Sequence, residues 1–116
     1  MENVLDSDRA AQQLAELGNS HRLDAFRLLV KAGEGGLAVG EIQDHLSIPG
    51  STLSHHLSRL VWAGLVVQSR EGRVLRCRAN FEAMRGLIGF LADECCTGVE
   101  TSCCAVDDVQ AKEAKR

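Results

Sequence analysis

The sequence predicts one mostly helical domain that carries a small β-hairpin. The chain has 116 residues, enough for a single modest core and too few for two. It contains three Phe, one Trp and no Tyr, so the core must be aliphatic, which favours packed helices over a large sheet. Apolar residues recur at helical spacing along most of the chain and alternate only over residues 65–78. We therefore expect about five helices and one two-stranded antiparallel hairpin.

Each expected helix combines an apolar stripe with residues that start or stop it. The helices are expected over residues 7–17, 20–32, 39–46, 51–63 and 81–94. Ser7 and Ser20 are the expected N-caps of the first two, and Gly18 and Gly33 close them. Residues 47–50 separate the third helix from the fourth. The last helix has an apolar stripe too wide for the small core that it covers, which suggests a partner chain.

The fourth helix has two faces of opposite character. Its apolar stripe consists of Leu53, Leu57, Leu60 and Val61. Its other face holds hydroxyl, imidazole and guanidinium groups and no carboxylate, from Thr52, His55, His56 and Arg59. Such donors suit base edges and phosphates. A short helix, a tight turn and a helix with this polar face predict a helix-turn-helix that binds DNA.

The hairpin is expected over residues 65–70 and 73–78, on either side of Glu71-Gly72. This pair reads as a two-residue turn, with Gly at the position that favours a positive φ. Alternation puts Cys77 on the inner, apolar side, where it would be a small buried hydrophobe, and Arg76 on the outer side. The hairpin would be an arginine-lined wing, so the predicted fold class is a winged helix-turn-helix.

The charge of the chain is divided in a way that suits DNA binding. The formal net charge is −3, but residues 51–80 carry five Arg and one Glu, a net charge of +4. Residues 1–50 have a net charge of −4, and residues 81–116 a net charge of −3. The positive field therefore lies over the fourth helix and the wing, as phosphate binding requires. The residues expected to contact DNA are Ser51, Thr52, Ser54, His55, His56, Arg59, Arg70, Arg73 and Arg76.

Most of the cysteines lie in a short C-terminal tail. Four of the five occur within ten residues, as Cys95, Cys96, Cys103 and Cys104. No signal peptide and no apolar run long enough to span a membrane is evident, so a cytoplasmic location with reduced thiols is expected. We divide the chain into a DNA-binding and dimerisation domain, residues 1–94, and a cysteine-rich inducer-binding tail, residues 95–116. Neighbouring residues on a helix do not face each other, so Cys95 and Cys96 can hold one ion only if the helix ends or unwinds there.

Three segments resemble the ArsR/SmtB family of small winged-helix repressors that sense metals or metalloids. They are Ser20-His21-Arg22-Leu23, Ser51-Thr52-Leu53-Ser54-His55-His56-Leu57 and Ala63-Gly64-Leu65-Val66, and the similarity covers roughly residues 8–94. The resemblance implies a homodimer joined by the first and last helices, a palindromic operator, and derepression when an inducer binds.

The cysteines indicate a branch of this family. Arsenic sensors of the best-known type carry Cys-x-Cys at the third helix, where this chain has Ala38 and Gly40. Zinc sensors place Asp and His on the last helix, and residues 81–94 contain no His. Branches with a C-terminal Cys-Cys and a later Cys sense trivalent arsenic, and this tail resembles them. The resemblance implies an arsenic site of three thiolates, from Cys95, Cys96 and either Cys103 or Cys104.

Charge also favours trivalent arsenic as the inducer. Arsenite enters as a neutral acid and leaves a neutral complex with three thiols, whereas Zn²⁺ or Cd²⁺ in four thiolates would carry two negative charges beside several local carboxylates. Soft thiolates still bind Cd, Pb and Zn, and thiol oxidation is a further alternative. A catalytic thiol protein is the other functional class. It is disfavoured because the chain has no Cys-x-x-Cys, no phosphate-binding loop and no basic residue close to the thiols in sequence. We expect no enzyme activity. His21 and His45 are isolated in the sequence and are expected to be structural or solvated.

Overall fold

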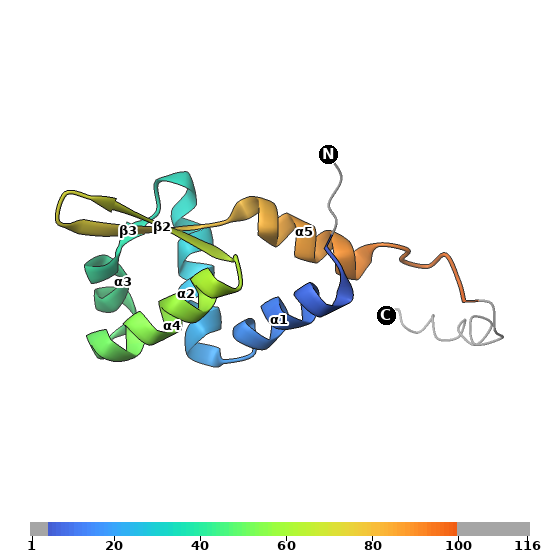
Figure 1. Ribbon diagram of the computed structural model, residues 1–116, viewed down its shortest axis with the longest axis horizontal. Coiled ribbons are helices and arrows are strands. Elements are labelled where there is room, and N and C mark those ends of the chain that lie inside the picture. The colour runs from blue at the N-terminus through green and yellow to red at the C-terminus, as the bar shows by residue number, and fades with distance from the viewer. Residues whose placement is uncertain (1–4, 100–116) are drawn as a thin grey trace.

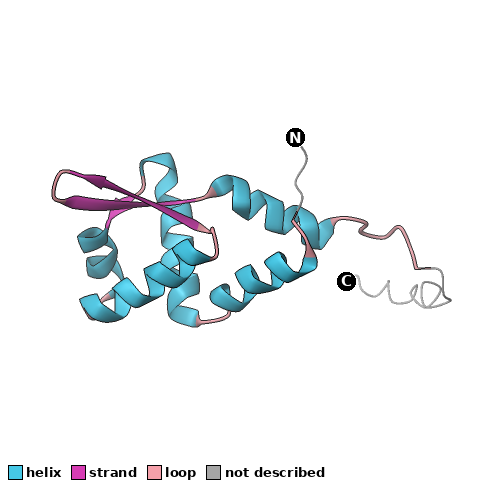
Figure 2. Cartoon of the chain, viewed as in Figure 1, coloured by secondary structure: helices cyan, strands magenta, loops and turns pink. Residues whose placement is uncertain are grey.

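A computed structural model describes residues 5–99, which form a winged helix-turn-helix domain (Figures 1 and 2). In chain order its elements are α1 (Ser7–Leu17), α2 (Ser20–Ala32), the 3-10 turn η1 (Gly33–Gly35), β1 (Leu37–Ala38), α3 (Val39–Leu46), α4 (Gly50–Trp62), β2 (Val66–Glu71), β3 (Val74–Ala79) and α5 (Phe81–Ala92). The predicted fold class is confirmed. Figure 1 shows α3, α4 and the β2–β3 wing toward one end of the domain, while the C-terminal tail leaves from the other end, beside α1 and α5.

The first two helices begin as predicted, but their caps lie one residue earlier. The Asp6 side chain accepts a hydrogen bond from the Arg9 backbone N–H at 2.8 Å and caps α1. Asn19 accepts from the backbone N–H groups of His21 and Arg22 and caps α2. Ser7 and Ser20 are the first helical residues, so their assignment as caps was wrong. Asp and Asn cap helices as well as Ser does, and here each stands one position earlier.

The sheet has a third strand that the sequence did not predict. β3 lies in the centre and pairs antiparallel with β2 and with the two-residue strand β1. The hairpin turn is Gly72-Arg73, because Glu71 pairs with Val74; the predicted turn, Glu71-Gly72, was one residue too early. Gly72 has a φ of 67°, as predicted for the turn glycine. Strand β1 is too short for alternation to reveal it.

The core lies where α2, α3, α4 and the sheet meet. Its fully buried side chains are Leu29, Ile42, Leu53, Leu57, Leu60, Leu65 and Cys77. Each leucine here contributes about 1.5–3 kcal/mol by leaving water. Cys77 is a buried apolar residue, as predicted. Val61, which the sequence placed in the apolar stripe of α4, is 37% exposed and lies outside the core.

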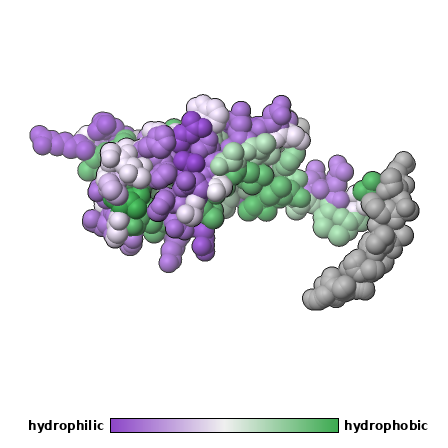
Figure 3. Space-filling model, turned by 90° about the horizontal axis from the view of Figure 1, so that it is seen from below, coloured by the Kyte–Doolittle hydropathy of each residue, from purple (hydrophilic) through white to green (hydrophobic). Residues whose placement is uncertain are grey.

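Helices α1 and α5 leave apolar side chains exposed. Leu14, Ile88 and Leu91 are 41%, 58% and 60% exposed, although Leu87 of the same stripe is buried. Figure 3 shows hydrophobic surface gathered on the half of the domain from which the tail leaves. In residues 5–99 no helix is both long enough and apolar enough to cross a membrane.

Candidate DNA-binding face and thiol site

The exposed face of α4 consists mainly of small hydroxyl residues. Ser51, Thr52, Ser54 and His55 are exposed, whereas Leu53 and Leu57 of the same helix lie in the core. Ser58 was not among the residues predicted to contact DNA, but it is exposed four residues after Ser54, and both serines line one groove beside α4. The helical spacing of Ser51, Ser54 and Ser58 is the signal that could have identified it.

His56 lies inside the domain, contrary to the prediction that it belongs to the exposed polar face. It is 7% exposed, and its Nδ1 lies 3.2 Å from Nη1 of Arg22. A guanidinium can only donate, so Nδ1 accepts and the proton of the neutral ring is on Nε2. Burial, and then the nearby charge of Arg22, lower the pKa of His56. His21, predicted to be structural or solvated, is exposed and stacks on His56 with ring centroids 5.7 Å apart.

Arg59 is held by a carboxylate from another helix. Its Nε donates to Oε1 of Glu16 in α1 at 3.2 Å, and its Nη2 donates to Oε2. The Arg59 guanidinium also lies 4.9 Å from the ring of Trp62. Glu16 is only 5% exposed, and the hydrogen bond from Arg59 is the largest of the influences that lower its pKa. No local pattern in the sequence reveals this pair, because 43 residues separate its members.

The wing divides its arginines into paired and unpaired groups. Nε of Arg76 donates to Oε1 of Glu71 at 2.9 Å, and Nη2 of Arg78 donates to Oε2 at 3.2 Å. Arg70 and Arg73 are exposed and form no salt bridge within residues 5–99. Of the three wing arginines predicted to bind DNA, Arg70 and Arg73 are therefore the ones free to do so.

A groove separates the wing from the helix-turn-helix. It has a volume of about 970 Å³ and lies between α3, α4 and the β2–β3 hairpin. Its polar lining includes Ser54 and Ser58 of α4 and Arg73 and Arg76 of the wing. The structure thus brings the hydroxyl face of α4 and the wing arginines to one surface, where phosphate and base-edge contacts could be made together.

The thiol pair lies directly after α5. That helix ends at Ala92, and Glu94 and Cys96 adopt left-handed conformations with φ of 64° and 65°. The chain therefore leaves helical geometry before the cysteines, and the Cys95 and Cys96 sulfurs come within 3.0 Å of each other. Both thiols are exposed, and the hydrogen bond between them is the main reason why the pKa of Cys96 is raised. The last helix was expected over residues 81–94, and it ends two residues earlier than that.

The remaining predicted ligands, Cys103 and Cys104, lie outside the described residues, and so does the tail after Val99. Residues 5–99 contain no group of three or more side chains suited to holding a metal ion. The described part of the chain thus supplies two thiols of the predicted site.

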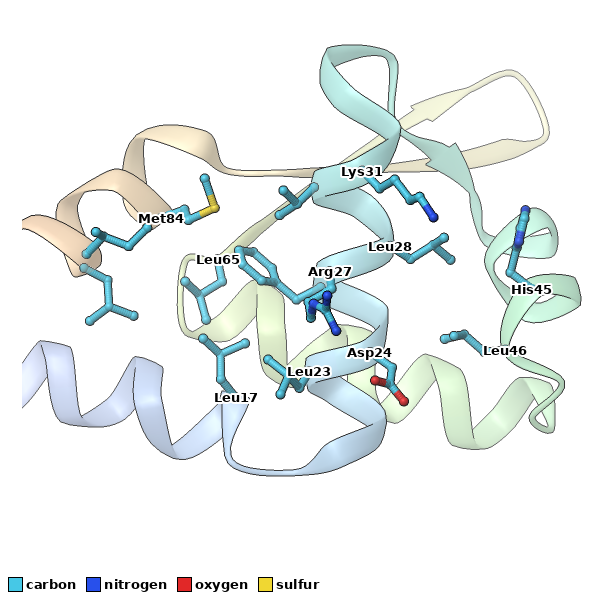
Figure 4. Close-up of a pocket in the computed structure, with 14 residues that line it drawn as sticks. Leu17, Leu23, Asp24, Arg27, Leu28, Lys31, His45, Leu46, Leu65 and Met84 are labelled. Carbon is cyan, nitrogen blue, oxygen red and sulfur yellow. The ribbon is translucent and has the colours of Figure 1, made fainter. Parts of the chain in front are cut away.

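A second hollow, with a volume of about 740 Å³, lies between α2, the end of α3 and α5; its lining is mostly apolar but includes Asp24, Arg27, Lys31 and His45 (Figure 4). Leu17, Leu23, Met84 and Ile88 are among its lining residues. Leu23 and Ile88 are also exposed, so this hollow is continuous with the apolar surface of α5.

Comparisons with known proteins agree with this arrangement. A family model described as a helix-turn-helix domain matches residues 17–69. An uncharacterised HTH-type transcriptional regulator from Methanocaldococcus jannaschii is 38% identical over 65 residues, which is 56% of this chain and 71% of that protein. A candidate arsenical resistance operon repressor from Halobacterium salinarum is 35% identical over 71 residues, or 59% of each chain.

Among solved structures, the chain is similar to a homodimeric winged helix-turn-helix DNA-binding domain from Mycobacterium bovis, described as a possible ArsR-family transcriptional regulator. The two are 29% identical with a TM-score of 0.60, and the match covers 81% of this chain and 92% of that one.

Proposed function

Since the chain belongs to the ArsR family of winged helix-turn-helix transcriptional regulators, we propose that it is a repressor that leaves its operator when trivalent arsenic binds its C-terminal thiolates. This fold and its relatives are those of DNA-binding regulators and not of enzymes. The observation that carries the inducer proposal is the 3.0 Å approach of the Cys95 and Cys96 sulfurs at the end of α5.

Operator binding would use the surface around the groove beside α4. The exposed hydroxyls of α4 and His55 suit base edges, and Arg70 and Arg73 are free for phosphates. His56 is excluded from direct contact by its burial. We propose that the operator is palindromic, because a two-fold symmetric dimer presents two copies of this surface.

The dimer would be formed through α1 and α5. Leu14, Ile88 and Leu91 expose large apolar areas that one protomer leaves uncovered. The M. bovis neighbour is described as homodimeric, which supports the same assembly here.

Arsenic binding at the tail follows from the chemistry of the thiols. Each of three thiols gives its proton to one hydroxyl of arsenous acid, so three As–S bonds and three waters form and no net charge develops. A protonated pair suits this exchange, and the raised pKa of Cys96 keeps that thiol protonated. The carboxylates of Asp93 and Glu94 stand next to the pair, and they would oppose the negative charge of a divalent metal held by four thiolates. The third thiol would come from Cys103 or Cys104.

The coupling to DNA would run through α5. Cys95 follows α5 by three residues, and α5 belongs to the proposed dimer surface. Arsenic that draws Cys95, Cys96 and a later cysteine together would bias how two protomers are spaced, and with them the two α4 helices.

The test is release of DNA measured by fluorescence anisotropy. A labelled duplex, selected by the protein from a random library, is bound and then titrated with arsenite, antimonite, Cd²⁺, Pb²⁺ or Zn²⁺ under reducing conditions. We expect release by arsenite and antimonite at the lowest doses. Release by Cd²⁺, Pb²⁺ or Zn²⁺ but not by arsenite would show that the inducer is a soft divalent metal. Release only on oxidation by diamide would show that the protein responds to thiol oxidation.

A further inference from the structure

The only described carboxylate that joins α1 to α4 is that of Glu16, and it lies at the centre of a buried network. Its Oε1 lies 3.4 Å from Nε of Arg22 as well as 3.2 Å from Nε of Arg59. Arg22 also donates from Nε to the Glu16 carbonyl at 2.8 Å and from Nη1 to His56. Glu16 is thus bound to α2 through Arg22 and to α4 through Arg59.

The contact between Glu16 and Arg59 is bidentate and uses one edge of the guanidinium. Nε and Nη2 both face the Glu16 carboxylate, while the Arg59 side chain as a whole stays 43% exposed. Trp62 lies under the same group at 4.9 Å. The Nη1 edge of Arg59 has no hydrogen-bond partner in residues 5–99, so it is the edge free for an acceptor in solvent.

This arrangement differs from that of the wing arginines. Glu71, which binds Arg76 and Arg78, is itself exposed, so water and salt compete for those pairs. Glu16 is buried, its charge is already opposed by Arg22, and its carboxyl remains ionised because Arg59 and Arg22 hold its pKa low. An arginine paired with such a carboxylate loses less rotamer freedom when its other edge binds a phosphate.

We propose that Glu16 is a positioning residue of the DNA-binding face, which holds the inner edge of Arg59 so that the outer edge contacts a DNA phosphate while the Glu16–Arg59 pair stays intact. The inference rests on the proposed function, since it requires that α4 binds DNA. Gln13, on the same side of α1, donates to the carbonyl of Ala63, the C-cap residue of α4, at 3.2 Å, so α1 binds α4 at Arg59 and also at its C-cap.

The proposal requires that Glu16 act through Arg59, which a double-mutant cycle tests. The variants are Glu16→Gln, Arg59→Gln and the double variant, with Asp8→Asn as a control that makes the same charge change on an exposed part of α1. Glu16→Gln preserves the shape of the side chain, and in Arg59→Gln the Glu16 carboxylate keeps Arg22 as its partner. Affinity for the selected duplex is measured over a range of KCl concentrations, and thermal unfolding checks the fold.

We expect Glu16→Gln to weaken binding by about 3- to 10-fold, the scale of restoring part of the freedom of one arginine side chain. The slope of log affinity against log KCl concentration (the salt slope) should match that of the wild type, because the charge of Arg59 remains. Arg59→Gln should reduce the slope by about one, and Glu16→Gln should have no further effect in that background.

An equal loss of affinity in both backgrounds would mean a general structural role and would overturn the proposal, as would no effect of Glu16→Gln. Binding tighter than that of the Asp8→Asn control would mean that Glu16 competes with DNA for Arg59, which also overturns it. If Glu16→Gln unfolds, Glu16→Asp keeps the charge beside Arg22 and carries the same test. Failure of the wild type to select any duplex would refute the proposed function itself.

Discussion

Nη1 of Arg22 lies 3.2 Å from Nδ1 of His56, and this contact fixes His56 as a neutral hydrogen-bond acceptor inside the domain. Protonating His56 would place a second positive charge beside Arg22, with His21 and His55 close by. The neutral ring is therefore part of what the fold requires.

The first prediction concerns stability and pH. The pKa of His56 is below 6.5 in the folded protein, so the unfolded chain takes up a proton more readily as the pH falls. The free energy of unfolding should therefore decrease as the pH drops below about 6.5. Urea unfolding from about pH 7.5 to about pH 5.5 measures this, above the range where Glu16 titrates. His56→Gln should flatten the dependence relative to the exposed control His45→Gln, and equal slopes would show that another group is responsible.

The second prediction separates two wing arginines. Arg73 has no ion pair among the described residues, whereas Arg76 is bound to Glu71. Arg73→Ala should weaken binding to selected and random duplexes alike and lower the salt slope by about one. Arg76→Ala should have a smaller effect, because Glu71 already opposes its charge. Fluorescence anisotropy titrations over a range of KCl concentrations measure both affinities and salt slopes. A salt slope unchanged by both substitutions would mean that the wing does not touch DNA.

The third prediction addresses the dimer. Leu91→Glu puts a charge on an apolar residue that is 60% exposed in one protomer, so each protomer should remain folded while dimers dissociate. Leu87 is 6% exposed, and Leu87→Glu should unfold the domain instead. Sedimentation equilibrium reports the assembly, with Val67→Glu as a control at a similarly exposed site on β2. If the monomeric variant still binds a selected duplex as tightly as the wild type, DNA binding does not need a dimer on two half-sites, and the dimer model is wrong.

The fourth prediction concerns the thiols. Cys95→Ser or Cys96→Ser should leave DNA binding intact and abolish release by arsenite, since a hydroxyl does not replace a soft thiolate. One of Cys103→Ser and Cys104→Ser should abolish release and the other should be tolerated. If the Cys95/Cys96 double variant leaves DNA at the wild-type arsenite dose, the inducer site lies elsewhere.

Cys77→Ser serves as the contrasting variant. Cys77 is fully buried and accepts a hydrogen bond from Gln68 at 3.4 Å, so a hydroxyl there needs an acceptor that the core does not offer. The substitution should cost about 1–3 kcal/mol of stability and leave the arsenite dose for release unchanged.

Local periodicity was sufficient for the elements but not for their long-range contacts. The bounds of α3 were predicted to the residue, and Thr52 and His55 are exposed as the spacing of α4 requires. His56 has the same local pattern, and only the arrival of Arg22 from a helix 34 residues away makes its burial favourable.

The first helix shows the same limit. Its buried residues are Ala10, Gln13 and Glu16, while Leu14 is exposed. Hydropathy alone would predict the opposite, with Leu14 buried and with Gln13 and Glu16 exposed. Gln13 and Glu16 are buried because α4 offers them a carbonyl and a guanidinium, and no local pattern in α1 reveals those partners.

The contrast between the buried Cys77 and the exposed Cys95 and Cys96 makes the chain easy to label chemically. In a variant whose Cys96, Cys103 and Cys104 are replaced by Ser, a maleimide spin label would attach to Cys95 beside the end of α5 and leave the buried thiol of Cys77 unmodified. In a symmetric assembly each label would have a twin, and pulsed electron resonance would report the distance between them.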